Sequence, residues 1–158
     1  MSLPLFFHHN INEQEDSLVL DEEASKHVVQ VLRMKAGESL QLTNGKGVLL
    51  TAEIINDHKK SCTVKKISIE NIPAPSKKIS IAISLVKNNT RFEWFLEKAT
   101  EIGISEIIPL ICHRTERQHF RYDRMNSILI SAMMQSHQTW LPILQEPMTF
   151  EKMILKIG

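Results

Sequence analysis

Residues 79–112 read ISIAISLVKNNTRFEWFLEKATEIGISEIIPLIC, and this stretch decides the fold class. Two apolar runs, at 79–86 and 105–112, enclose a segment whose apolar residues recur at helical spacing. The first run is almost entirely apolar or small, which is typical of a strand buried on both faces. A strand, a helix and a second strand with short connections predict a parallel βαβ unit with a right-handed crossover.

The helix of this unit is expected over residues 91–102. Its apolar stripe consists of Phe92, Phe95, Leu96, Ala99 and Ile102. Trp94 is assigned to a core or an interface, because large residues of amphipathic helices usually pack. Gly103 follows as a natural helix stop. Pro109 predicts a bulge or an exposed end in the second strand, since proline has no N–H to donate to a sheet.

Two further helices are expected, over residues 121–137 and 149–156. The longer one carries an apolar face composed of Tyr122, Met125, Ile128, Leu129, Ala132 and Met133. A parallel sheet of only two strands would leave its faces and edges uncovered. We therefore expect either a partner chain to complete this layer or the sequence to be a fragment.

The residues before position 71 show mainly strand patterns. Strand candidates lie at 3–7, 17–20, 39–43, 48–55 and 62–69, and a slip in the alternation of the last one suggests a bulge. NGKG at 44–47 is a strong hairpin signal, because Asn-Gly accepts the positive φ of a tight turn. This order fits a small antiparallel barrel with one helix.

That helix is expected to run through residues 24–33, with Asp21 as its cap and Gly37 as its stop signal. Its apolar face would comprise Ala24, His27, Val28, Val31 and Leu32. Further along, the proline-containing segment 71–78 (NIPAPSKK) marks a boundary. The chain is thus divided into a barrel domain at 1–72, a linker at 73–78 and an α/β domain at 79–158.

The composition is that of a globular protein that can bury a core. Hydrophobic residues make up 42% of the chain and charged residues 23%, and the net charge is +1. No apolar run reaches the roughly 18 residues of a membrane span, and the start lacks the features of a signal peptide, so a cytoplasmic location is expected. Cys62 and Cys112 stand alone, which predicts buried thiols rather than a disulfide framework or a metal site.

No GxGxxG, Walker, HExxH or GxSxG motif occurs, so the residues alone reveal no complete active site. What recurs is the placement of cations where helices and strands end. We predict RNA-binding roles for Arg33, Lys35, Lys59, Lys60, Lys87, Arg91, Arg114 and Arg117. Arginine offers a planar fork to phosphate oxygens, and the loops after parallel strands are where α/β proteins bind ligands.

Each cation also has an ordinary structural interpretation. Arg33 and Lys35 would complement the carboxyl end of a helix. Lys59 and Lys60 suit any solvated turn. Arg114 and Arg117 could instead pair with Glu116 or Glu101.

Three segments together resemble the ribosomal small-subunit RNA methyltransferase E family of the knotted SPOUT class. They are HVVQVLRMKAGESLQLTNGKG (27–47), FLEKATEIGISEIIPLICHRTER (95–117) and AMMQSHQTWLP (132–142). The resemblance implies a PUA-like barrel that holds RNA, followed by a methyltransferase domain. It also implies a homodimer that methylates N3 of a uridine in 16S, small-subunit ribosomal RNA with S-adenosylmethionine.

The resemblance assigns individual positions as well. Arg114 matches the family's arginine after the second sheet strand, beside the substrate groove. Glu101 matches the glutamate before the helix-ending glycine, and Arg33 matches the arginine that closes the first helix. Met134 and Gln138 depart from the family pattern, which has an acid and a base at these positions.

A glycine-rich loop and a final segment that build the knot and the cofactor pocket in the family do not occur in this sequence. The cofactor contacts are therefore expected beyond Gly158, no catalytic residue is assigned, and the 158-residue chain alone is expected to be inactive. Two rival hypotheses remain open. The chain could be a non-catalytic RNA-binding module, or a structural dimer subunit.

Overall fold

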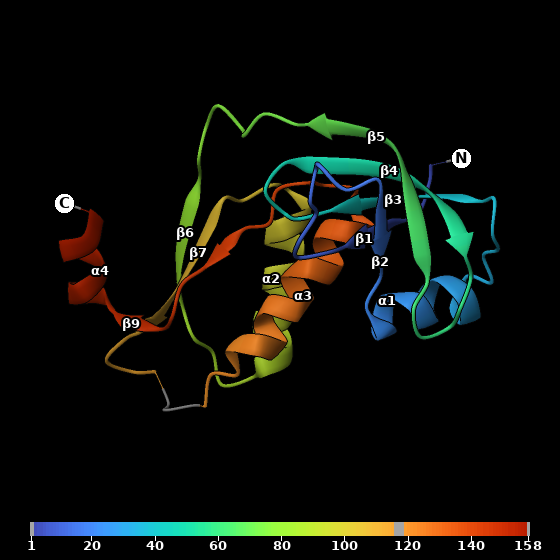
Figure 1. The fold of residues 1–158 in the computed structure, drawn as a ribbon. Coiled ribbons are helices and arrows are strands. Elements are labelled where there is room, and N and C mark those ends of the chain that lie inside the picture. The colour runs from blue at the N-terminus through green and yellow to red at the C-terminus, as the bar shows by residue number, and fades with distance from the viewer. Residues whose placement is uncertain (1, 116–118, 158) are drawn as a thin grey trace. The chain divides into compact units, whose positions relative to one another are not determined.

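The computed structural model describes residues 2–115 and 119–157 (Figure 1). The chain divides into two compact units, Met1–Ala74 and Pro75–Gly158. The first unit is built around a curled five-stranded sheet, and the second around a sheet of parallel strands. The predicted fold class, a small β-barrel-like unit followed by an α/β unit, is confirmed.

The sheet of the first unit has the strand order β1-β3-β4-β5-β2. Its strands are β1 (Leu5–Phe7), β2 (Ser17–Val19), β3 (Ser39–Thr43), β4 (Val48–Asn56) and β5 (Thr63–Asn71). β1 pairs with β3 in parallel, and the other neighbours are antiparallel. Asn44 closes the predicted β3–β4 hairpin, because its Oδ1 accepts from the backbone N–H of Lys46 at 2.8 Å.

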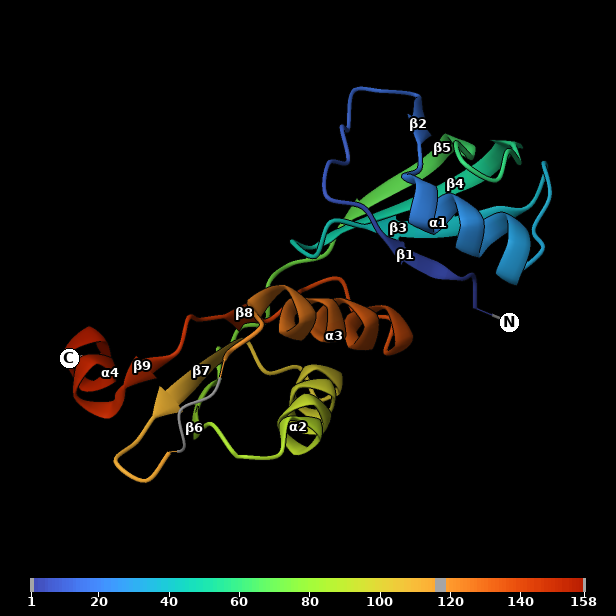
Figure 2. The same cartoon turned by 90° about the horizontal axis from the view of Figure 1, so that it is seen from below.

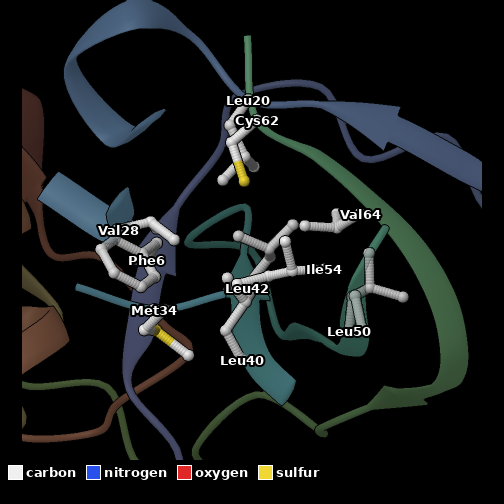
Figure 3. Packing of buried hydrophobic residues seen from close by; sticks show 11 residues of the cluster. Phe6, Leu20, Val28, Met34, Leu40, Leu42, Leu50, Ile54, Cys62 and Val64 are labelled. Carbon is white, nitrogen blue, oxygen red and sulfur yellow. The ribbon is translucent and has the colours of Figure 1, made fainter. Parts of the chain in front are cut away.

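The core of this unit lies between the curled sheet and one short helical segment (Figure 3). Leu42 and Ile54 lie in the middle of the cluster, with Phe6 and Val28 to one side. Leu42 and Val28 are completely buried. Apolar burial of this kind is the main stabilising contribution to such a small unit.

The helical segment differs from the prediction. α1 (Glu22–Lys26) begins at the expected cap, where Asp21 Oδ1 accepts from Ala24 N at 2.8 Å. It continues as a π-helical turn, η1 (His27–Val31). The wider turn rotates the later residues away from the core, so Val31 is 66% exposed although the helical spacing predicted it to be buried. Leu32 is exposed for the same reason.

The slip in the alternation of β5 is confirmed as a bulge. Thr51 pairs with Ser68 and Ala52 with Lys66, which leaves Ile67 without a partner residue on β4. Ile67 is exposed, as expected for the extra residue of a bulge.

The second unit has β7 (Glu106–Ile111) at the centre of a parallel sheet. β6 (Ser80–Ser84) lies along one of its edges, while β8 (Ile143–Leu144) and β9 (Met148–Thr149) pair with successive parts of the other. The two short strands were not predicted, because runs of two residues carry no periodicity. They extend the two-stranded layer that the sequence indicated.

Three helices accompany this sheet. α2 (Asn89–Glu101) and α3 (Tyr122–Gln135) lie side by side and share one core with Ile107 of β7 (Figure 2). α4 (Phe150–Ile157) places Met153 in a second cluster, with Ile108 of β7. Ile107 and Ile108 point to opposite faces of the strand, so the sheet has helical residues on both faces. The three helices predicted for this region are confirmed.

Several apolar residues that were assigned to the core, or for Trp94 to a core or an interface, do not lie in the core. β6 was expected to be buried on both faces but is an edge strand whose residues are half-buried or exposed. Ile102 caps the end of α2 and is 76% exposed, because Gly103 takes the chain out of the helix with a φ of 83°. Trp94 is also exposed, which excludes a place in the core of this unit.

Pro109 was predicted to mark a bulge or a strand end, and it does neither. It pairs in regular register with Ile83 in the middle of β7. The carbonyls of Ser105 and Ile107 accept hydrogen bonds on the β8 side of the strand, and the alternation of a strand points Pro109 the same way. On that side β8 ends at Leu144 and β9 begins at Met148. The missing N–H therefore falls in the gap between the two strands.

No helix in the described part of the chain is both long enough and apolar enough to cross a membrane.

Candidate nucleic-acid interface

Four of the predicted cations gather at one end of the first unit. Lys35 Nζ lies 3.3 Å from Asp57 Oδ2, and the backbone N–H of Gly37 donates to Ile54 O at 2.8 Å. These contacts hold the segment after η1 against the end of β4. Lys59 and Lys60 follow Asp57 in the same turn, and both are exposed. Arg33 is also exposed, two residues before Lys35.

The backbone of Arg33 has a φ of 56°, in the left-handed region. A residue with a Cβ pays roughly 1–2 kcal/mol for this conformation. Arg33 therefore ends the helical segment in a position where glycine would be less strained. The sequence indicated Gly37 as the stop, which lies beyond the turn that ends η1.

A cavity of about 300 Å³ opens where β6 and β7 end in the second unit. It brings together two predicted cations, Lys87 and Arg114, that are far apart in the sequence. Among the described residues, the lining consists of Ser84, Leu85, Val86, Lys87, Cys112, Arg114 and Thr115. The cavity thus lies at the carboxyl ends of parallel strands, where open α/β sheets bind ligands.

Two hydroxyl groups for which the sequence predicted no role connect the two strands at this cavity. Thr115 Oγ1 accepts from the backbone N–H of Cys112 at 2.9 Å and lies 3.0 Å from Ser84 Oγ. The signal for them in the sequence is weak, because threonine and serine beside a turn commonly bond to nearby backbone. Only the pairing of β6 with β7 brings Ser84 to Thr115.

The remaining predicted cations have other positions. Arg91 is exposed in the first turn of α2 and does not line the cavity. Arg117, like Glu116, lies outside the described residues.

Glu101, which the resemblance also assigned, forms an ion pair within α2. Lys98 Nζ lies 2.9 Å from its Oε1. The hydrogen bonds to Glu101 and then to Glu97 raise the pKa of Lys98.

Arg124, in the same cation-rich part of the sequence, fastens α3 to α2. Its Nε and Nη2 donate to the two carboxylate oxygens of Glu93 at 2.6 and 2.9 Å. The hydrogen bond from Arg124 lowers the pKa of Glu93 below its ordinary value. This bidentate pair is structural, since it occupies the guanidinium fork that a phosphate would use.

Gln138 also has a structural role. Its Nε2 donates to the carbonyls of Thr100 and Glu101, at 3.0 and 2.8 Å. It therefore adds a side-chain donor to two carbonyl groups at the end of α2, of which Thr100 O also accepts from the backbone N–H of Gly103. Gln138, one of the two positions that depart from the family pattern, thus joins the segment after α3 to α2.

Comparison with known proteins agrees with this two-unit organisation. The RNA methyltransferase domain family matches residues 73–158, and the RNA methyltransferase PUA domain family matches residues 20–67. The ribosomal RNA small subunit methyltransferase E of Synechocystis sp. is 30% identical over 85% of this chain. This chain spans 45% of that relative, about half its length.

Solved structures give the same result. A "probable rRNA-methyltransferase" from Porphyromonas gingivalis is 37% identical, with a TM-score of 0.87, and the match covers 96% of this chain and 63% of that one. A Legionella pneumophila protein solved with the cofactor SAM bound is 27% identical, with a TM-score of 0.83, over 99% of this chain and 67% of that one. The chain belongs to the RNA methyltransferase family that combines a PUA domain with a methyltransferase domain, the family of the ribosomal RNA small subunit methyltransferase E proteins.

Proposed function

We propose that this chain holds ribosomal RNA for methylation by S-adenosylmethionine (SAM). The observation that carries the proposal is the cavity at the ends of β6 and β7, which brings two cations together. Phosphate oxygens accept hydrogen bonds from lysine and arginine side chains. The names of the relatives support ribosomal RNA as the substrate, and the SAM-bound Legionella structure supports the methyl donor.

Within this proposal the two units divide the task. Residues 1–72 orient the RNA through Arg33, Lys35, Lys59 and Lys60, residues 73–78 form the linker, and residues 79–158 receive the target. The target is N3 of a uridine, extruded from its stack toward the methyl donor. N3 is weakly acidic, so loss of its proton would help it to attack. We assign that proton transfer to none of the described residues.

The cavity does not fit SAM itself. The cofactor carries a positive sulfonium, a positive ammonium and a negative carboxylate group, while the described residues that line the cavity include two cations and no carboxylate. The two cations attract the carboxylate of SAM but repel its sulfonium and ammonium groups, which find no negative partner among these residues. We therefore derive no methyl-transfer step through these residues and assign them to RNA. Calorimetry should detect no SAM binding to the 158-residue chain, and micromolar affinity would contradict this assignment.

A salt series tests the proposed RNA contacts. Each lysine or arginine that neutralises a phosphate contributes about 0.7–0.9 to the slope of log affinity against log salt concentration. We expect Lys59→Ala/Lys60→Ala to weaken binding to small-subunit ribosomal RNA and to flatten this slope by about one to two units. Arg114→Ala should remove about one unit.

The control for this series is Lys77→Ala/Lys78→Ala, which removes the same charge from two exposed residues before β6. It should leave the slope close to that of the wild type. Equal effects of the two double variants would show that only net charge matters, and the proposed sites would then be wrong.

The second candidate function is an RNA-binding module without catalysis. The cation-lined cavity favours this reading as much as the first, because phosphate contact requires no methyl donor. A methylation assay with labelled SAM and small ribosomal subunits separates the two. Label in the RNA supports the enzyme, whereas tight RNA binding without transfer supports the module. Light scattering of the same preparation tests the homodimer that the family resemblance implies.

A further inference from the structure

Arg114 is carried by a tight turn that spans Cys112 to Thr115. The backbone N–H of Thr115 donates to Cys112 O at 2.9 Å, and the N–H of Cys112 donates to Thr115 Oγ1, also at 2.9 Å. The threonine thus bonds to Cys112 with both its backbone and its side chain. Arg114 lies inside this closed turn, and its own side chain is exposed.

The same hydroxyl connects the turn to the neighbouring strand. Thr115 Oγ1 lies 3.0 Å from Ser84 Oγ, and Ser84 Oγ donates to Leu85 O at 3.3 Å. Either hydroxyl can supply the hydrogen between them. The polar contacts thus run from Cys112 N–H through Thr115 Oγ1 and Ser84 Oγ to Leu85 O.

We propose that Thr115 is a positioning residue, which acts through Arg114 and fixes this guanidinium against the end of β6. This inference rests on the proposed RNA-binding function and extends it to a residue that makes no phosphate contact itself. The physical reason is that an arginine on a loose turn must be ordered when it binds, whereas a turn held at two points is already ordered. Ser84 provides the second point.

Two substitutions separate the hydroxyl from the size of the side chain. Thr115→Val keeps the shape but removes both hydrogen bonds of Oγ1, whereas Thr115→Ser keeps them. We expect Thr115→Val to weaken binding of small-subunit ribosomal RNA by roughly three- to tenfold, the effect of about one hydrogen bond. Thr115→Ser should remain within about twofold of the wild type. Thr51→Val, in β4 of the other unit, is the matched control.

A double-mutant cycle with Arg114→Ala tests whether Thr115 acts through the arginine. In the Arg114→Ala background, Thr115→Val should cause no further loss, because the group it positions is absent. A loss of equal size in both backgrounds would overturn the inference and leave the RNA-binding function standing. If Arg114→Ala itself leaves RNA binding unchanged, the proposed function fails at this cavity, and the inference fails with it.

The turn can also be observed without RNA. Cys112 lies in the turn and lines the cavity, whereas Cys62 is fully buried, so a thiol reagent should alkylate Cys112 first. Thr115→Val should speed this reaction and Thr115→Ser should not, since only the valine variant loosens the turn. Equal alkylation rates in the wild type and both variants would contradict the inference.

Discussion

Single residues decide how much of the positive charge on the first unit is available to a ligand. The Lys35 ammonium is 3.3 Å from the Asp57 carboxylate, so the protein already holds an anion where a phosphate would bind. A phosphate must compete with this internal partner. The ion pair with Asp57 therefore makes the affinity of Lys35 for a phosphate lower than that of an unpaired lysine.

Asp57→Asn tests this competition. We expect the variant to bind ribosomal RNA more tightly, with a salt slope steeper by up to about one unit, because Lys35 can then neutralise a phosphate. Asp16→Asn is the matched control, since Asp16 is 3.9 Å from Lys66 and 92% exposed. Unchanged or weaker binding of Asp57→Asn would show that Lys35 contacts no phosphate.

The pair between Glu93 and Arg124 predicts a pH dependence of stability. The hydrogen bond from Arg124 lowers the pKa of Glu93 in the folded protein. The unfolded chain therefore binds a proton at a higher pH than the folded chain does. The Glu93–Arg124 pair stabilises the folded protein fully above the usual glutamate pKa of about 4.3. This contribution disappears as the pH falls through the lower pKa that Glu93 has in the folded protein.

We expect the difference in unfolding free energy between wild type and Glu93→Gln to be constant near neutral pH and to shrink below about pH 4. Urea denaturation followed by tryptophan fluorescence measures it. Glu146→Gln, on the exposed connection between β8 and β9, should show no such trend. A difference that stays constant down to the lowest pH would contradict the structural role of the pair.

At the scale of elements, one buried hydroxyl joins α1 to the sheet of the first unit. Ser25 is completely buried, its Oγ donates to Leu20 O at 3.2 Å, and it accepts from Cys62 N at 2.9 Å. Ser25→Ala would leave the buried N–H of Cys62 without this acceptor. An unsatisfied buried group of this kind costs about 1–3 kcal/mol.

We therefore expect Ser25→Ala to lower the unfolding free energy of the first unit by that amount, measured by urea denaturation and circular dichroism. Ser68→Ala, at an exposed position of β5, should change it by less than about 0.5 kcal/mol. Equal stabilities for both variants would mean that Cys62 N–H finds another partner.

Predictions of helix ends and turns from the sequence succeeded where neighbouring residues in the chain determine the structure. The Asn44 turn, the Asp21 cap and the Gly103 stop each depend on residues close together in the chain. They failed at Val31 and Pro109. Val31 was misplaced because a π-helical turn changes the angle per residue, and Pro109 because the gap between β8 and β9 accepts a proline.

For the whole molecule, the two units have cores with no residue in common. Leu42 is completely buried in the first and Leu129 in the second. Both tryptophans, Trp94 and Trp140, belong to the second unit. Fluorescence therefore reports the unfolding of that unit, while circular dichroism reports both.

Because the two cores are separate, we expect leucine-to-alanine substitutions in them to have different effects on the fluorescence and dichroism signals. Leu129→Ala should lower the fluorescence-detected stability by about 2–5 kcal/mol, the usual cost of a leucine truncated in a core. Leu42→Ala should shift the dichroism signal and leave the fluorescence midpoint near that of the wild type. Equal shifts of the fluorescence midpoint by both variants would show that the units unfold together.

The sequence by itself determined most of the helices and strands, their order and the family resemblance, but not β8, β9 or the π-helical turn. These depend on periodicity and on turn residues, whose physical effects reach only a few positions along the chain. The resemblance to RNA methyltransferases was also contained in the sequence, and the family comparison confirms it.

The tertiary structure alone decided which residues meet. Lys87 and Arg114 line one cavity, and Ser84 bonds to Thr115, because parallel pairing sets β6 beside β7. The tertiary structure also shows that Arg124 and Gln138 have structural roles, because both bond to residues of α2. Such contacts join residues about 27 to 38 positions apart. No local pattern encodes them, since they exist only once the strands and helices have packed.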